Sequence, residues 1–139
     1  MGRLSVAVNF AAQVLVSPHT LRHKALDATD GWREQLRRGG LEMAVMLVVA
    51  STPRYGLEII RHLDDERDLA LPEGTIYPLL ARLTRDGILD AEWRPTEPHP
   101  RKYYRLTAAG RRRLKDMCAE WRAFAATMTK LMAEAGEER

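Results

Sequence analysis

The sequence of 139 residues predicts a mostly helical fold with one small β-hairpin and a long C-terminal helix. Three observations predict this fold. Apolar residues recur at helical spacing up to residue 87, whereas residues 88–94 and 101–106 alternate as strands do. A three-proline loop at residues 95–100 separates the two alternating segments. Beyond residue 113, apolar residues follow a regular spacing of three and four, which is typical of one long helix.

Basic residues are concentrated in one region, although the formal net charge is only +3. Residues 98–115 contain seven basic residues and no acidic one, while many acidic residues lie in residues 64–68 and 134–138. A local excess of positive charge is typical of a surface that binds a polyanion. The distribution of charge, rather than its total, therefore indicates a nucleic-acid partner.

Several classes of protein are disfavoured by composition. The single cysteine, Cys118, excludes an intrachain disulfide framework and favours a reducing, cytoplasmic location. The four histidines have no metal-ligand spacing, and no apolar run reaches the ~18–20 residues of a membrane span. Residues 4–16 are the only candidate leader, but they lack a cleavage pattern. No P-loop, nucleophile elbow, HExxH or paired CxxC occurs, so we expect no enzyme, no cofactor and no metal.

The N-terminal part has the weakest pattern. We assign residues 1–31 to an extension that is either poorly ordered or packed on a partner surface. Residues 32–38 look helical, and the pair Gly39 and Gly40 is expected to interrupt the helix. Residues 41–50 are apolar nearly all round, which predicts a buried central helix.

Two amphipathic helices follow. Residues 55–64 place Leu57, Ile60 and Leu63 on one face. After a polar connection, residues 72–86 again have one apolar side. This second helix should begin at a proline suited to the first turn, and Gly87 should end it in a left-handed conformation.

The second of these helices carries polar groups on its open side. Thr75, Tyr77, Pro78 and Arg82 lie mostly off its apolar stripe. A short helix with a buried back and a polar front fits the major groove of DNA, where Arg82 would reach a phosphate or a guanine. The alternatives are an ordinary surface helix and a surface ion pair for Arg82. The neighbouring segments are needed to decide between these interpretations.

The alternating segments form a β-hairpin whose return strand is basic. Thr107 should then cap the last helix, because its hydroxyl can accept from an early backbone amide. Three helices followed by such a hairpin is the order of a winged helix-turn-helix, in which the hairpin is the wing. We assign residues 32–106 to this DNA-binding domain.

The last helix, residues 107–135, carries a strict heptad stripe. We predict that this stripe forms a dimer interface, because no further chain remains to cover its C-terminal half. Packing on the chain's own winged helix is the alternative. Residues 136–139 form a charged tail. The predicted dimerisation residues are Leu114, Met117, Trp121, Phe124, Met128 and Leu131.

Several motifs together resemble the PadR family of bacterial transcriptional regulators. The most specific are GTIYPLL at residues 74–80 and RKYYRLTAAG at residues 101–110. RGGLE at residues 38–42, YGLEII at residues 55–60 and DGIL at residues 86–89 extend the resemblance to roughly 100 of the 139 residues. The chain departs from the family in having Gly40 where threonine is common. Its proline-rich wing tip also replaces a glycine-rich one.

The resemblance implies a homodimeric repressor that binds a palindromic double-stranded DNA operator. In some members of the family, a small aromatic effector such as a phenolic acid or a drug releases the DNA. Trp121 falls at the position of a tryptophan that contacts drugs at the dimer centre of one subgroup. The alternative is that Trp121 only packs. A winged helix used for protein–protein association without DNA is the alternative function.

Within this framework the exposed residues receive roles. Thr75 and Tyr77 should meet phosphates or base edges, because recognition helices present their N-terminal residues to the groove. Arg101 and Lys102 should enter or flank the minor groove. Of the two tyrosines at positions 103 and 104, one should lie in the core and the other face phosphate, since neighbouring strand residues point oppositely. The predicted DNA-binding residues are Tyr55, Thr75, Tyr77, Pro78, Arg82, Arg101, Lys102, Tyr103 and Arg105.

Overall fold

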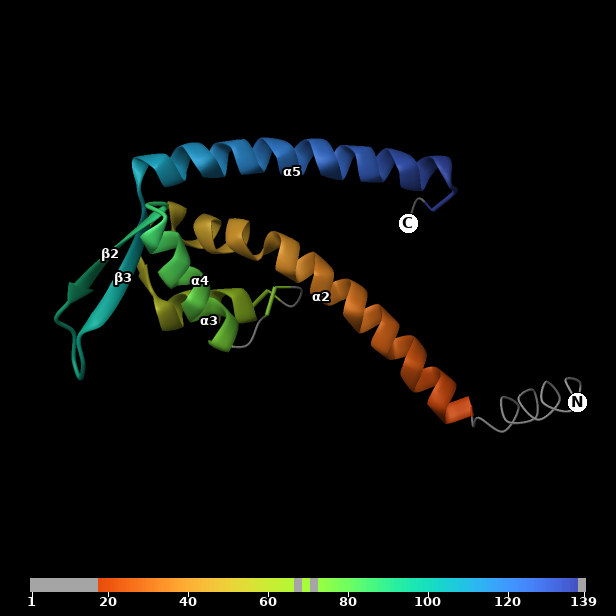
Figure 1. The fold of residues 1–139 in the computed structure, drawn as a ribbon, viewed down its shortest axis with the longest axis horizontal. Helices are drawn as coiled ribbons and strands as arrows, with labels where there is room; N and C mark the ends of the chain where they lie inside the picture. The colour runs from red at the N-terminus through yellow and green to blue at the C-terminus, as the bar shows by residue number, and fades with distance from the viewer. Residues whose placement is uncertain (1–17, 67–68, 71–72, 138–139) are drawn as a thin grey trace, which may run out of the picture. The chain divides into compact units, whose positions relative to one another are not determined.

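The computed structural model describes residues 18–66, 69–70 and 73–137 (Figure 1). The candidate leader at residues 4–16, the predicted helix start at residues 71–72 and the last two residues of the charged tail fall outside the described residues. The chain divides into two units, Met1–Arg38 and Gly39–Arg139. In chain order, the elements are α2 (Pro18–Ala50), β1 (Arg54–Tyr55), α3 (Gly56–Asp64), α4 (Glu73–Arg85), β2 (Leu89–Arg94), β3 (Arg101–Leu106) and α5 (Ala108–Glu134).

The predicted class, mostly helical with a small sheet and a long C-terminal helix, is confirmed. In Figure 1, β2 and β3 project as a hairpin, and α5 follows from the base of β3 and extends past α3 and α4. The hairpin is the predicted wing, and α3 and α4 are the two helices of the predicted helix-turn-helix.

The expected break at Gly39 and Gly40 is wrong, because α2 is one continuous helix from Pro18 to Ala50. Glycine inside a helix costs only about 0.5–1 kcal/mol relative to alanine, so favourable neighbours can carry the helix through it. Residues 18–31, which we assigned to an N-terminal extension, form the first part of this helix.

The sheet has three antiparallel strands in the order β1-β3-β2, one strand more than the hairpin alone. Arg54 and Tyr55 pair with Tyr104 and Tyr103, so the helix expected from residue 55 begins at Gly56 instead. Tyr55 has an extended backbone, with φ −85° and ψ 163°, and directly precedes that helix. The short strand therefore fixes the start of α3 against the middle strand of the sheet.

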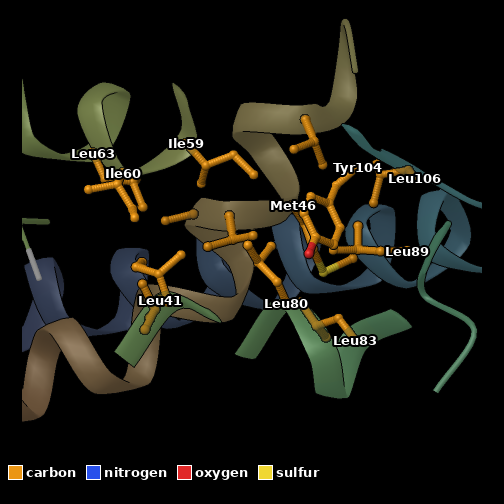
Figure 2. Packing of buried hydrophobic residues seen from close by; sticks show 14 of the residues in the cluster. Leu41, Met46, Ile59, Ile60, Leu63, Leu80, Leu83, Leu89, Tyr104 and Leu106 are labelled. Atoms are coloured by element: carbon orange, nitrogen blue, oxygen red, sulfur yellow. The ribbon is translucent and has the colours of Figure 1, made fainter. Parts of the chain in front are cut away.

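The core lies where α2, α3, α4, the sheet and the start of α5 converge. In Figure 2, Leu80 and Leu83 from α4 lie near Met46, Leu89 and Tyr104. The heptad leucine Leu114 brings α5 into the same cluster. The buried apolar residues are Leu41, Ala44, Val45, Met46, Val49, Ile59, Ile60, Leu63, Ile76, Leu80, Leu83, Leu89, Tyr104, Leu106 and Leu114.

The predicted left-handed end of α4 is confirmed at Gly87, which has φ 74°. The amide of Ile88 donates to the Leu83 carbonyl at 2.9 Å, and the Gly87 amide donates to the Thr84 carbonyl at 3.1 Å. This is the Schellman pattern, which satisfies carbonyls at a helix end. It turns the chain from α4 directly into the wing.

The predicted cap of α5 is also confirmed. The amide of Gly110 donates to Thr107 Oγ1 at 2.9 Å, and the amide of Thr107 donates to the Ile88 carbonyl at 3.1 Å. A Cβ atom at Gly110 would overlap that same carbonyl oxygen. The glycine therefore allows the first turn of α5 to lie against the backbone that leads into β2.

Candidate nucleic-acid interface

The start of α4 is buried on one side and open on the other. Ile76 and Leu80 lie in the core, whereas Thr75 and Pro78 are exposed and Tyr77 is 46% exposed. The structure therefore has the two-sided helix that the apolar spacing predicts. Its open side carries hydroxyl groups near the helix N-terminus, the end that a recognition helix presents to DNA bases.

The ring of Tyr77 lies over the N-terminus of α3. A Cβ atom at Gly56 would be only 2.6 Å from Tyr77 Cε1, so this approach depends on a residue without a side chain. The glycine of the YGLEII motif and the tyrosine of the GTIYPLL motif are thus two halves of one contact. That contact packs the N-terminal part of α4 against the start of α3.

On one face of the wing, two arginines lie over two tyrosine rings. Arg101 Cζ is 4.3 Å from the centroid of the Tyr55 ring, and Arg94 Cζ is 4.4 Å from that of Tyr103. The two rings meet edge to face, with centroids 5.6 Å apart. We call this set the arginine–tyrosine stack. A cation–π contact holds each guanidinium group through the ring face, so its charge is not neutralised by that contact.

Arg94 was missed by the sequence analysis. It pairs in register with Arg101, so the alternation of the two strands was the signal that could have found it. Arg94 Nε also lies 3.8 Å from Glu92 Oε2, a long contact between two exposed side chains. Such exposed pairs contribute little to stability.

On the opposite face of the wing, side chains near the base are buried in the core and those near the tip are exposed to solvent. Tyr104 is the core tyrosine and Tyr103 is on the outer face, which decides between the two orientations that alternation allows. Burial raises the pKa of the Tyr104 phenol, and the nearby Tyr77 raises it further. Further out, Trp93 is 66% exposed and Lys102 Nζ lies 6.0 Å from its ring centroid. Trp93 is a second exposed wing residue that the sequence analysis did not select.

An open groove of about 280 Å³ lies between the start of α4 and the wing. It brings together four predicted residues that are up to 47 positions apart in the chain, Tyr55 and Lys102 being the outermost. Thr75 and Pro78 lie on α4 outside its lining. The lining residues are Tyr55, Gly56, Leu57, Tyr77, Trp93, Arg101, Lys102 and Tyr104.

Two other predicted cations are already paired with carboxylates. Arg105 donates to Asp90 Oδ2 from Nη2 at 2.8 Å and from Nε at 3.2 Å, and this hydrogen bonding lowers the pKa of the Asp90 carboxyl. Arg82 Nη2 lies 3.2 Å from Glu42 Oε2, and Arg82 Nη1 lies 3.8 Å from Asp86 Oδ2. For Arg82, the structure thus has the ion pair that we considered as the alternative.

The apolar stripe of α5 leaves the core as it proceeds. Leu114 is buried and Met117 is half-buried, whereas the four later stripe residues are exposed, Phe124 by 59%. The rings of Trp121 and Phe124 lie 6.5 Å apart. An open cleft of about 780 Å³ adjoins them. It is lined by Gly39, Gly40, Met43, Arg113, Asp116, Met117, Glu120, Trp121 and Phe124.

Within residues 18–66, 69–70 and 73–137, no three His, Cys, Asp or Glu side chains are grouped so that they could hold a metal ion. None of the helices described there is both long enough and apolar enough to cross a membrane.

Comparison with known proteins places this geometry in a family. The Transcriptional regulator PadR-like family matches residues 45–116. A PadR family regulator from Eggerthella lenta is 34% identical, with a TM-score of 0.73, over 79% of this chain and 96% of that one. A transcriptional regulator of Mycobacterium tuberculosis is 30% identical over 82 residues, which are 59% of this chain and 76% of the relative.

A likeness in fold alone extends to Bacillus subtilis PadR, whose structure was solved in complex with operator DNA. The identity is 23% and the TM-score 0.52, over 56% of this chain and 45% of that one.

Proposed function

Because the chain belongs to the PadR-like family of transcriptional regulators, we propose that it is a homodimeric repressor that binds a palindromic DNA operator through α4 and the wing. The observation that carries this proposal is the groove between them, which is lined by Tyr77 of α4 together with Arg101 and Lys102 of β3. Bacillus subtilis PadR, which has a similar fold, binds operator DNA.

In the proposed complex, the first turns of α4 enter the major groove. Thr75 and Tyr77 offer hydroxyl groups to base edges or phosphates, and Pro78 packs beside them. The wing follows the sugar–phosphate backbone into the minor groove, with Arg101 and Lys102 as its cations. The arginine–tyrosine stack supports this role, because the Arg101 guanidinium group is held over the ring of Tyr55 instead of by a carboxylate.

The proposed dimer forms through the α5 stripe, Leu114, Met117, Trp121, Phe124, Met128 and Leu131. The exposure of its last four members supports an interface, since a regular row of large apolar side chains is uncommon on a monomer surface. The spacing of three and four suits helix–helix packing. A second copy would bury the residues that this chain's own winged helix leaves uncovered.

We propose further that the cleft beside Trp121 takes a small aromatic effector. Trp121 and Phe124 supply aromatic faces and Met43 supplies apolar surface. Asp116, Glu120 and Arg113 line the same cleft, and Arg113 is paired with Glu42. The two remaining carboxylates favour a planar compound with a positive charge over an anionic one. By linkage, an effector that lowers the affinity for operator DNA by some factor must have its own affinity lowered by DNA by the same factor.

A DNA titration across salt concentration tests the proposed function. With a random-sequence 30-base-pair duplex, log affinity should fall steeply with log salt, and Arg101→Ala should lower the slope by about one unit because one phosphate contact is lost. Arg38→Ala, which removes a cation paired with Glu34 on α2, is the matched control and should leave the slope unchanged.

The slope also separates the two candidate functions. Binding without salt dependence, or no binding at all, would remove DNA from the proposal and leave the protein–protein module. An unchanged slope for Arg101→Ala would remove the wing while leaving α4 in place.

A further inference from the structure

One carboxylate joins three helices of the winged domain. Glu42 lies on α2 with its side chain 21% exposed. Its Oε2 accepts from Arg82 Nη2 of α4 at 3.2 Å. Its Oε1 accepts from Arg113 Nε of α5 at 3.1 Å and lies 2.9 Å from Arg113 Nη2 in an ion pair. Both oxygens are therefore used, one for the recognition helix and one for the long C-terminal helix.

This bridge differs from ion pairs that lie within one helix. Arg38–Glu34 and Lys130–Glu134 each lie within one helix, four residues apart. Glu42 is 40 residues from Arg82 and 71 from Arg113. A pair within a helix supports only that helix, whereas a bridge between distant segments restrains their relative positions.

The location of the bridge on α5 determines what it can restrain. The first turn of α5 is fixed by the Thr107 cap and by Arg111, whose Nη1 donates to the Ala50 carbonyl at 3.3 Å. Leu114 is the last buried residue of α5. Arg113, beside it, contacts Glu42 of α2 at the point where the helix leaves the core.

The length of α5 makes its direction sensitive to that contact. Its 27 residues span about 40 Å. A change of about 5° in direction at the base of such a helix displaces its far end by about 3.5 Å. That is close to the rise of one DNA base pair, ~3.4 Å. A dimer built along α5 would pass this displacement to the spacing of its two recognition helices.

We propose that Glu42 is a positioning residue that fixes the direction of α5 relative to α4, and thereby the half-site spacing at which a dimer binds its operator. The spacing part rests on the proposed function, whereas the direction of α5 can be measured without DNA. The ion pair with Arg113 links Glu42 to α5, and the ion pair with Arg82 links the same carboxylate to α4.

The first experiment measures the direction of α5 in the full chain without DNA. Spin labels are placed at exposed positions of α4 and α5, as Ala81→Cys and Arg122→Cys in a Cys118→Ser background. An excess of unlabelled chain restricts the signal to pairs within one protomer. Glu42→Gln keeps the size of the side chain but removes its charge, and it should broaden the distance distribution about twofold. Glu34→Gln makes the same chemical change in a local pair and should not broaden it.

A second variant distinguishes loss of the bridge from a folding defect. Arg113→Gln changes an exposed side chain and should broaden the distribution as Glu42→Gln does, with an unchanged circular dichroism spectrum. Distributions for both variants that superimpose on the parent would overturn the proposal, whatever the protein does with DNA.

The second experiment measures spacing. An inverted repeat selected by the parent chain from a random duplex pool is rebuilt with its spacer one base pair longer and one shorter. The parent should bind the duplexes with altered spacers about tenfold more weakly than the selected one. Glu42→Gln should bind them no more than about threefold more weakly. A sharp preference in Glu42→Gln would overturn the spacing role. If the parent selects no inverted repeat, the proposed function is wrong. The distances between the spin labels still decide in that case whether Glu42 positions α5.

Discussion

Gly110 lies at the junction between the wing and α5, and its replacement by alanine should destabilise the fold. A Cβ atom there would approach the Ile88 carbonyl oxygen far inside the 3.0 Å that Cβ atoms keep, and would also lie 3.2 Å from Leu106 Cδ2. The obstacle is backbone, which cannot rotate away as a flexible side chain can. Either the first turn of α5 or the segment before β2 must therefore move.

The size of the effect follows from three terms. Forcing extra volume into a packed site costs about 1–3 kcal/mol. A shift also weakens the hydrogen bond from the Thr107 amide to the Ile88 carbonyl at 3.1 Å. It displaces the Thr107 hydroxyl as well, which lies 2.6 Å from the Gly87 carbonyl oxygen and 3.1 Å from that of Ile88, and each of these two donors contributes about 1 kcal/mol. Alanine offsets about 0.5–1 kcal/mol through its higher helix propensity. The net loss should be about 2–4 kcal/mol, or roughly 6–16 °C in Tm for a chain of this length.

Thermal and urea unfolding at one fixed protein concentration measure this loss, because dimerisation makes the apparent stability depend on concentration. Gly39→Ala is the matched control. Gly39 lies inside α2 with nothing within 4 Å of its added Cβ, so that variant should gain about 0.5–1 kcal/mol. A Gly110→Ala chain as stable as Gly39→Ala would show that the close approach at Ile88 does not exist in solution.

Two further predictions concern the dimer and the wing. Trp121→Ala should weaken the dimer in sedimentation experiments and abolish the quenching of tryptophan fluorescence by aromatic cations. A variant that still dimerises as the parent does and is still quenched would contradict our assignment of the cleft and of the centre of the stripe. The hydrogen bond from Arg105 lowers the folded-state pKa of Asp90, so its contribution to stability is present above the unfolded-state pKa and lost as the pH falls through the folded-state value. Asp90→Asn should accordingly be less stable than the parent at neutral pH, with a difference that closes in urea titrations below about pH 4; a difference independent of pH would contradict the ion pair.

Much of the fold could be predicted from local patterns. The apolar spacing of α4, the proline loop of the wing and the glycine at the end of α4 act over a few residues, so the sequence displays them directly. The third strand could not be found this way, because Arg54 and Tyr55 become a strand only by pairing with β3, nearly 50 residues later. The unbroken α2 was missed because glycine lowers helix stability without forbidding a helix.

The candidate site was predictable in its cations but not in their partners. Sequence alone selects Arg101 and Arg105 equally, since both lie on the basic strand β3. In the structure, register places Arg105 opposite Asp90 and Arg101 opposite Arg94, so one is neutralised and the other is not. Which cation is available to a phosphate is thus a property of strand pairing.

The arginine–tyrosine stack has a consequence for the speed of DNA recognition. An arginine held by a carboxylate must give up that partner before it can bind a phosphate, which adds a barrier to each encounter. Arg101, resting on the ring of Tyr55, has no such exchange to make through that contact. On the proposed function, its side chain is already ordered when DNA arrives, so an encounter proceeds without a local rearrangement. The wing would thus act early, retaining the duplex while α4 tests successive base pairs.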